Sequence, residues 1–309
     1  GRREHIVMTT NFSTLSGVSA LFLWSSLALL AASTVAMPPF LLLSICFFIG
    51  FTLSIAWRYY HQGQFLTKPK LNKAQWLLGI YGLFGYHFCY FFSLQFAPVL
   101  EVSLINYLWP LLLAIFVAKR ADKLFAVLGG GVAFSGIMAL LSGDQANFEQ
   151  SNIIGYLLAF SAAFIWASYS ALLTKHAGEL ADIGWLSLVI SILSLACHLI
   201  LEQTPEFNFL SQEMLTQAVF VLLIGIGPLG SAFYLWEYGI SQGNRTLLAS
   251  LSFLTPVGSS ILLASFGLAT WSSEIFIALS LILLGGLISH FNEWKPDSKL
   301  WLKQRPPLK

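Results

Sequence analysis

Long apolar runs separated by short polar breaks organise this chain. The hydrocarbon layer of a membrane needs roughly 20 apolar residues for each helical crossing. The runs are apolar on every side, which excludes a membrane β-barrel, whose strands alternate apolar and polar residues. The pattern therefore predicts an all-α membrane protein with ten transmembrane helices, near residues 15–34, 39–57, 75–95, 102–118, 124–141, 153–173, 184–201, 214–236, 246–267 and 273–291.

The composition agrees with the apolar runs. Hydrophobic residues make up 57% of the 309 positions and charged residues only 10%, against roughly 25% in soluble domains. The net charge of +2 predicts no nucleic-acid partner, and the lipid bilayer is the expected surrounding. The three cysteines, Cys46, Cys89 and Cys197, fall inside predicted spans, so no disulfide framework is expected.

The charged loop residues are divided between the two sides of the predicted membrane. If the ends of the spans alternate, all 16 lysines and arginines fall on one side. Basic loops stay in the cytoplasm, so both chain ends are predicted to be cytoplasmic, as an even number of spans requires. We expect Glu101, on the other side, to be a solvated entrance charge. The acids on that side are Glu101, Asp144, Glu149, Glu202, Glu206, Glu213 and Glu274.

The polar break Ser142–Asn152 divides the spans into two sets of five. Trp24 in the first span then matches Trp166 in the sixth, and Pro110 in the fourth matches Pro256 in the ninth, 142 and 146 residues apart. Chance recurrence is the alternative in a chain with 10 Trp and 11 Pro. An odd number of spans makes the second copy enter the membrane upside down, which is typical of secondary transporters.

This division predicts five segments. Residues 1–14 are a tag remnant and N-terminal tail, with Met8 as the natural start, and residues 292–309 are a cytoplasmic tail. Two inverted five-helix repeats cover 15–142 and 153–291, joined by a linker at 143–152. The pseudo-two-fold axis of such repeats lies in the membrane plane and places a substrate site near the middle of the bilayer, between the two halves.

Large polar-tipped side chains at mid-membrane depth are the candidates for substrate binding. Tyr86 and Tyr90 are four residues apart on one face of the third span. Asn106 and Trp109 lie in the half of the fourth span nearer the acidic loops, with Tyr107 about 100° round the helix. We expect them to line a cavity, although core packing or helix-to-helix hydrogen bonding would also satisfy their polar atoms. The full set is Trp24, Tyr86, Tyr90, Asn106, Tyr107, Trp109 and Trp166.

Four further residues are candidates for movement or for proton coupling. Pro110 and Pro256 each remove a backbone donor inside a span and are predicted hinges. His87 can titrate, but a lone histidine among apolar residues is more often structural. Glu237 is an acid at the edge of a span, where it either acts as a gate or simply reaches water and pairs with Arg245.

No enzyme motif stands in the sequence, since HExxH, a P-loop, GxSxG and cysteine-rich metal spacings are all missing. The chain is therefore predicted not to be an enzyme and to have no catalytic residue, metal site or cofactor. Because no motif would hydrolyse ATP, transport is expected to be secondary or facilitated. A membrane-embedded enzyme acting on lipid is a remote alternative, since it would need clustered intramembrane carboxylates or histidines.

Four segments carry a resemblance to a known family. They are EVSLINYLWP at 101–110, AFSAAFIWA at 159–167 with Tyr169, GISQGN at 239–244 and FLTPV at 253–257. In this order they resemble spans of the drug/metabolite transporter superfamily, in its EamA-type branch of bacterial aromatic amino-acid exporters. The resemblance covers residues 15–291. One position departs from it, because we expect asparagine in relatives where this chain has Glu237.

The resemblance implies ten spans in two inverted repeats and export across the bacterial cytoplasmic (inner) membrane by alternating access. The implied substrates are amino acids such as Phe, Trp, Tyr and Thr, and organic cations such as paraquat are the alternative. Aromatic faces suit both classes, because they stack on aromatic side chains and attract ammonium or pyridinium groups. Asn106 and the tyrosine hydroxyls are expected to orient an amino-acid head group.

Overall fold

A computed structural model describes residues 2–31, 37–142, 147–176 and 180–294, and these residues form helices and no strand. Six of the longer helices are unbroken: α1 (Arg2–Ala31), α2 (Pro39–Gln62), α7 (Lys123–Ser142), α8 (Ile153–His176), α9 (Leu180–Leu201) and α14 (Ser273–Ser289). Short 3-10 turns, η2 (Arg120–Asp122), η3 (Gln150–Asn152) and η5 (Phe291–Trp294), lie outside them.

Four more segments of the described chain are helices with a break or a change of winding. The first two are α3, η1 and α4 (Lys73–Gly79, Ile80–Gly85, Tyr86–Ser93) and α5 with α6 (Val99–Asn106, Trp109–Val117). The others are α10, η4 and α11 (Gln212–Ile226, Gly227–Ser231, Ala232–Gln242) and α12 with α13 (Arg245–Ser252, Leu254–Ser265).

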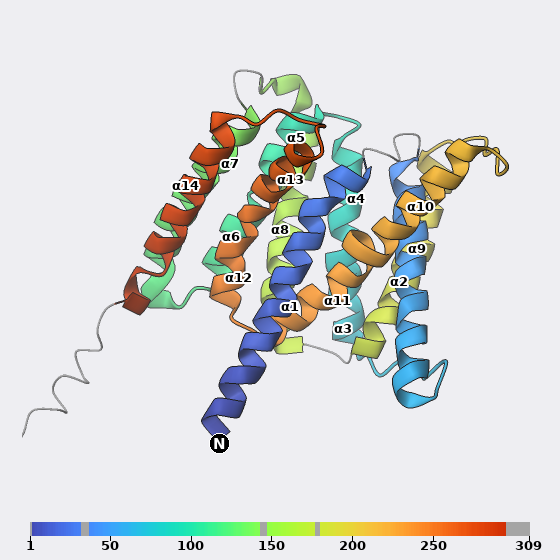
Figure 1. Ribbon diagram of the computed structural model, residues 1–309, viewed down its shortest axis with the longest axis horizontal. Helices are drawn as coiled ribbons and strands as arrows, with labels where there is room; N and C mark the ends of the chain where they lie inside the picture. The colour runs from blue at the N-terminus through green and yellow to red at the C-terminus, as the bar shows by residue number, and fades with distance from the viewer. Residues whose placement is uncertain (1, 32–36, 143–146, 177–179, 295–309) are drawn as a thin grey trace, which may run out of the picture.

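The helices run up and down between the two ends of one bundle (Figure 1). The N-terminus, the loop at 63–72 and the turn at 118–122 lie at the lower end in this view, and we call it the basic end because these segments carry lysines and arginines. The upper, acidic end holds the α7–α8 and α9–α10 connections. The described lysines and arginines of these segments are therefore gathered at one end of the bundle, together with the acids Asp122 and Asp182.

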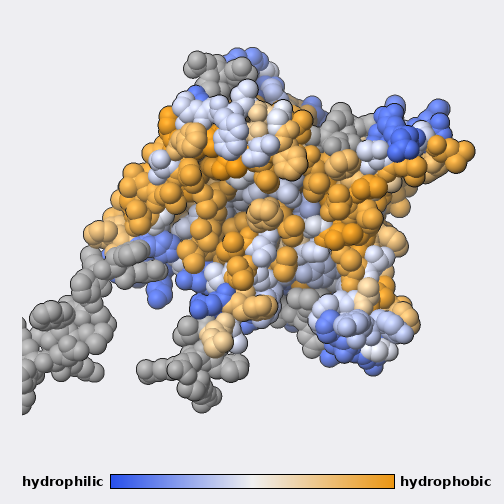
Figure 2. All heavy atoms as spheres, viewed as in Figure 1, coloured by the Kyte–Doolittle hydropathy of each residue, from blue (hydrophilic) through white to orange (hydrophobic). Residues whose placement is uncertain are grey.

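The predicted spans coincide with helices of apolar surface. Seven helical segments of the described chain are long and apolar enough to cross a membrane, and the bent pair α12–α13 makes an eighth. The predicted third span is helical from Lys73 to Ser93 with η1 inside it, and the tenth is the 17-residue α14. Figure 2 shows a broad hydrophobic band between polar ends. The protein is an all-helical, multi-pass membrane protein.

The first helix begins earlier than its apolar run predicts. α1 is helical from Arg2, so residues 2–14 of the expected tail continue the helix toward the basic end. No glycine or proline lies between Arg2 and Gly17, so nothing stops the helix where the apolar run stops. Residues 143–146 of the predicted linker and 295–309 of the predicted C-terminal tail lie outside the described residues.

Helices from the two halves of the chain pack in pairs. α2 lies along α9, where Ser44 Oγ donates to the Ser191 carbonyl at 2.9 Å and Ser191 Oγ donates to the Ser44 carbonyl at 2.7 Å. α7 lies along α14, where a Cβ on Gly129 would be 2.6 Å from the backbone nitrogen of Ser289. Small residues let both pairs approach closely. The predicted second and seventh spans are thus partners, as are the fifth and tenth.

Two central helices, α1 and α8, contact most of the broken segments. α1 packs on α11 and α13, where Ser16 Oγ donates to the Leu235 carbonyl and Ser259 Oγ donates to the Ser25 carbonyl, both at 2.9 Å. α8 packs on α4, α5 and α6. The predicted first span therefore contacts the eighth and ninth, while the sixth contacts the third and fourth, which is the same arrangement with the two halves exchanged.

The breaks in the helices also match between the halves. η1 and η4 are π-helical stretches in the predicted third and eighth spans, with the glycine-rich sequences IYGLFG and GPLGS. In η4, Pro228 removes a backbone donor from the helix, and the Pro228 carbonyl accepts the indole N–H of Trp24 at 3.0 Å. A side chain of α1 thus satisfies part of the backbone that the break leaves open.

The two predicted hinge prolines stand just after such breaks. α5 ends at Asn106 and α6 begins at Trp109, so Pro110 is in the first turn of α6. α12 and α13 meet at a bend of 45°, and Pro256 is in the first turn of α13. In the first turn, backbone N–H groups have no partner inside the helix, so the N–H that proline lacks costs the helix no hydrogen bond.

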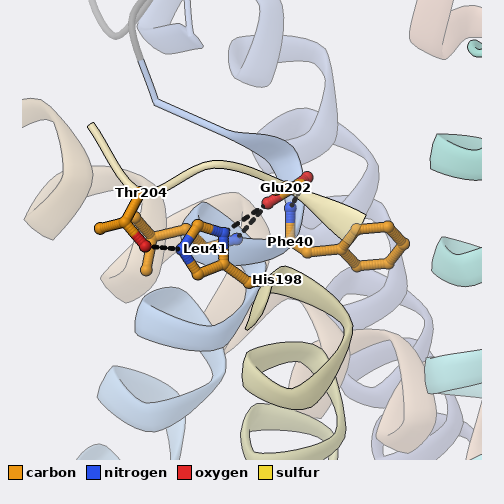
Figure 3. A network of polar contacts seen from close by, with 5 residues as sticks. All are labelled: Phe40, Leu41, His198, Glu202 and Thr204. Atoms are coloured by element: carbon orange, nitrogen blue, oxygen red, sulfur yellow. Dashed lines mark hydrogen bonds and ion pairs between the residues drawn. The ribbon is translucent and has the colours of Figure 1, made fainter. Parts of the chain in front are cut away.

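A polar network joins α2 to α9 at the acidic end (Figure 3). Glu202, which follows α9, accepts the backbone N–H of Phe40 at 2.9 Å and that of Leu41 at 3.3 Å. These are N–H groups of the first turn of α2, which have no partner inside the helix. His198 holds the carboxylate with Nδ1 at 2.8 Å, and its Nε2 lies 2.8 Å from Thr204 Oγ1. Glu202 therefore caps one helix from the end of another.

Replacing Glu202 by alanine is expected to destabilise the protein by about 1 to 3 kcal/mol, because the buried His198 loses its partner and two amides of α2 lose their acceptor. Thermal unfolding in detergent measures this loss. Glu206→Ala is the matched control, since Glu206 is an exposed carboxylate in the same connection. Equal unfolding temperatures for the two variants would contradict a capping role for Glu202.

Candidate functional site

A cavity of about 290 Å³ lies among the breaks of the helices. It extends toward the acidic end, to Ala31 and Leu42 at the neighbouring ends of α1 and α2. Its size is near the lower bound of small-molecule sites, which is roughly 300 Å³. The residues that line it are Trp24, Leu27, Ala31, Leu42, Tyr86, His87, Tyr90, Phe91, Ser103, Asn106, Tyr107, Trp109, Trp166, Leu229, Phe233 and Thr255.

All seven side chains that the sequence singles out for substrate binding line this cavity. Tyr86 and Tyr90 stack on one face of α4, with ring centroids 6.2 Å apart. Tyr107 joins Asn106 in the wall, although a continuous helix would turn it about 100° away. α5 ends at Asn106, and Tyr107 falls between α5 and α6. Residues on two faces of this span therefore border one space.

Two buried polar atoms in the wall have no hydrogen-bond partner. Asn106 Nδ2 donates to the hydroxyl of Tyr86 at 3.1 Å, which leaves Asn106 Oδ1 buried and unpartnered. Thr255 Oγ1, at the start of α13, is also buried and unpartnered. The two residues are 6% and 7% exposed, so bulk water does not satisfy them. Buried polar atoms without a partner are rare and call for an explanation. Asn106 and Thr255 each stand beside a break, in the predicted fourth and ninth spans, which match each other in the two halves.

Three tryptophans line the cavity and a fourth packs against them, and we call the four the tryptophan floor: Trp24, Trp109, Trp166 and Trp236. The ring centroids of Trp24 lie 5.5 Å from Trp166, 5.3 Å from Trp236 and 6.5 Å from Trp109. Trp109 meets Trp236 edge-on at 6.0 Å. Such edge-to-face contacts are favourable for aromatic rings. The indoles of Trp24 and Trp236 are fixed by hydrogen bonds to the Pro228 carbonyl and to Ser170 Oγ.

His87 lies in the wall, at 4% exposure. Its Nδ1–H donates to the Leu83 carbonyl one turn earlier, at 2.6 Å, so Nε2 is the acceptor nitrogen. Its ring packs edge-on against Phe47 and Phe233, at centroid distances of 5.7 and 5.6 Å. These contacts match those of a histidine that is held as part of the aromatic wall.

The wall carries no formal charge, since neither acids nor lysine or arginine are among its residues. It offers aromatic faces, the acceptors of Asn106 and Thr255, and the phenols of Tyr90 and Tyr107. Acceptor atoms can accept hydrogen bonds from the N–H groups of an ammonium, and aromatic ring faces attract its positive charge. A group of three or more metal-ligating side chains is not present in the described part of the chain. This chemistry fits binding of a small, overall neutral molecule with an aromatic or apolar part.

Two acids lie elsewhere than the sequence led us to expect. Glu101 is 4% exposed rather than solvated, and its Oε1 accepts the Asn147 backbone N–H at 3.0 Å. It stands in the first turn of α5, where Asn147, shortly before η3, contacts it. Glu237 is also largely buried, at 7% exposure inside α11, rather than solvated at the edge of a span. Neither acid lines the cavity, and neither of the two prolines, Pro110 and Pro256, lines it.

Sequence reasoning missed part of the site. Thr255 is a small polar residue of FLTPV, directly before Pro256, and that position was the available signal. Leu229 comes from η4 and Phe233 from α11. Both are apolar residues in an apolar run, so nothing in the sequence marks them as cavity residues. Trp236 of the floor sits near a span end, where tryptophan is common for other reasons.

Comparison with known proteins gives a consistent set of relatives, although no protein-family model matches the chain. The sequence is 36% identical over 288 residues to the aromatic amino acid exporter YddG of Ancylobacter novellus, with 91% of this chain and 98% of that protein covered. The protein of the same name from Escherichia coli is 28% identical, with 91% and 97% covered. A crystal structure of a protein 35% identical superposes with a TM-score of 0.82 over 91% of this chain and 97% of that one.

Proposed function

The chain belongs to the YddG family of exporters, in the drug/metabolite transporter superfamily, and from this premise we propose that it exports amino acids, aromatic ones included, across the bacterial inner membrane. The observation that carries the proposal is the uncharged aromatic cavity with two unpartnered acceptors in its wall. An aromatic side chain would stack on the tyrosines and tryptophans. The ammonium would donate to Asn106 Oδ1 and Thr255 Oγ1, which approach it from the two halves of the chain.

The mechanism that fits this site is alternating access between two inverted five-helix repeats. Support comes from the exchanged packing of α1 and α8, the pairs α2–α9 and α7–α14, and the matching breaks. With both termini in the cytoplasm, the cavity faces outward and the tryptophan floor separates it from the cytoplasm. Bending at the breaks before Pro110 and Pro256 would then open the floor while it closes the outer mouth.

Export of organic cations is the second candidate, because aromatic walls also attract pyridinium groups. A dication such as paraquat would enter a wall with no carboxylate, whereas a zwitterion brings its own compensating charge. The neutral wall therefore favours amino acids. Proteoliposomes loaded with phenylalanine, tryptophan, threonine or paraquat decide between the two. We expect faster release of amino acids than from liposomes without protein, and release of paraquat alone would contradict the proposal.

The Asn106→Leu variant is expected to raise the half-saturating concentration of phenylalanine by about 10- to 100-fold, since a hydrogen bond to a charged group contributes about 1.5 to 3 kcal/mol. Initial rates of release from proteoliposomes measure it. Tyr86→Phe is the comparison variant. It removes the hydroxyl that accepts the hydrogen bond from Asn106 Nδ2, and it keeps the aromatic ring and Asn106 Oδ1. We expect a smaller change from it. An unchanged half-saturation in Asn106→Leu would show that Oδ1 does not contact the substrate.

A further inference from the structure

Glu237 is a carboxyl buried in α11, and no described lysine or arginine forms an ion pair with it. Its side chain is 7% exposed and forms one hydrogen bond, from the Tyr169 hydroxyl to Oε2 at 3.5 Å. The structure records no ion pair for it within the described residues, so the expected pairing with Arg245 is not made. A long hydrogen bond compensates little for the lost hydration of an ionised carboxylate. In this arrangement the uncharged, protonated form is the one that burial favours.

The segments packed against α11 bring few ionisable groups toward this carboxyl. α8 contributes the phenol of Tyr169, which is 2% exposed. α1 meets α11 through Ser13, Ser16 and Gly17, and η4 has no ionisable side chain. Tyr234, one turn earlier on α11, binds the Gly50 carbonyl of α2 at 2.8 Å and faces Ser187 of α9.

The charged residues on the other two neighbours are held at helix starts. Arg245 is the first residue of α12, and Asp182 of α9 accepts the Lys70 backbone N–H at 3.0 Å. Neither forms an ion pair with Glu237 among the described residues. Among the described residues, the electrostatic surroundings of the carboxyl are therefore phenols and backbone dipoles.

Glu237 lies on the far side of the tryptophan floor from the cavity. It follows Trp236 directly, and its partner Tyr169 packs on Trp166 at a centroid distance of 5.3 Å. It does not line the cavity. α11 ends at Gln242, five residues later, or about 7.5 Å along the helix toward the basic end. Solvent would reach Glu237 first from the cytoplasmic side, when the segments under the floor separate.

We propose that Glu237, with Tyr169, is a proton-binding site on the cytoplasmic side of the floor, and that it is protonated while the floor is closed. Opening the cytoplasmic half hydrates the carboxyl, which then gives its proton to water and becomes carboxylate. Each closing of the floor takes the proton back from the cytoplasm. The proposal rests on alternating access, and it links the closed state to cytoplasmic pH through one bound proton. A rise in pH therefore favours opening.

Glu237→Gln tests the site, because glutamine keeps the shape of the protonated acid and cannot ionise. Counterflow of phenylalanine is measured in proteoliposomes with equal pH on both sides, varied from about 5.5 to about 7, between the ranges in which α-carboxyl and α-amino groups titrate. We expect the wild-type rate to rise with pH, by at most about tenfold per unit for one proton. The variant should be slow at every pH and independent of it. An equal pH dependence in both proteins would overturn the proposal.

Tyr169→Phe keeps the ring against Trp166 and removes the donor to the carboxylate. Without that donor the ionised form loses its hydrogen bond, so the rise in rate should move to higher pH. An unchanged profile would remove Tyr169 from the site.

A second measurement needs no substrate and separates this proposal from the proposed function. Thermal unfolding in detergent is followed against pH for the wild type and Glu237→Gln. The closed wild type should lose stability relative to the variant as pH rises, because its carboxyl must stay protonated to remain buried. A constant difference would overturn the proton site even if amino acids are exported. Conversely, if the wild type loses stability relative to the variant as pH rises but no amino acid shows counterflow, only the export proposal is contradicted.

Discussion

Replacing Trp109 by alanine is expected to slow the release of phenylalanine by more than about tenfold and to destabilise the protein by about 3 to 5 kcal/mol, the usual cost of removing a buried indole. Trp109 is 5% exposed and meets Trp24, Trp166 and Trp236 edge-on or nearly so. Without it the tryptophan floor has a hole at its centre, and the wall loses the ring beside the break that positions Asn106.

The release assay in proteoliposomes and thermal unfolding in detergent measure the two effects separately. Trp271→Ala is the control, because Trp271 is 55% exposed and lies in the connection between α13 and α14. Its stability should stay within about 0.5 kcal/mol of the wild type, as for surface substitutions in general. If Trp109→Ala and Trp271→Ala release phenylalanine equally fast, the tryptophan floor has no part in transport.

Placing alanine at Gly129 is expected to separate α7 from α14 and to destabilise the protein by about 1 to 3 kcal/mol or more, as overpacking of a close contact does. The added Cβ would overlap Ser289 Oγ and the carbonyl oxygen of Gly285, and would lie 2.6 Å from the Ser289 backbone nitrogen. Backbone atoms of two packed helices cannot give way as a flexible side chain can. Thermal unfolding in detergent measures the loss.

Matched controls stand on the same two helices. Gly131, two residues along α7, has open space where a Cβ would be, and so does Gly286 on α14. Gly131→Ala should be neutral or should stabilise the helix by up to about 1 kcal/mol, because alanine is the better helix former. Gly285→Ala should behave like Gly129→Ala, since its Cβ would overlap the Gly129 carbonyl oxygen. A loss of stability at Gly131 equal to that at Gly129 would refute the close-contact explanation.

Particular residues show how far the sequence reaches. The seven candidates for substrate binding line one cavity because depth along a span can be counted from its polar ends, and spans of similar length bring equal depths together. Tyr107 lies about 100° round the helix from Asn106 by count, and it still borders the cavity, at the end of α5. Thr255 carried too weak a signal to be singled out, since threonine is common in helices and only its unpartnered hydroxyl marks it.

The burial of two acids shows most clearly what the sequence did not predict. From the sequence, Glu101 and Glu237 each stand at the end of an apolar run, where reaching water is the simplest expectation. Glu101 is held by a contact with Asn147, and Glu237 is buried in α11 among residues of α1 and α8. These contacts join residues 46 and 68 positions apart in the chain. No local pattern encodes them.

The sequence by itself therefore determined the membrane environment, the helical class, the approximate span limits and the family of this protein. Those properties follow from the length and polarity of local segments, and a lipid solvent leaves an apolar run no alternative to a helix. Tertiary structure alone decided which acceptors remain unpartnered in the wall, how four tryptophans meet and which acids are buried. The physical reason is that burial and hydrogen bonding belong to neighbours brought together by packing, and packing is settled between segments rather than within them.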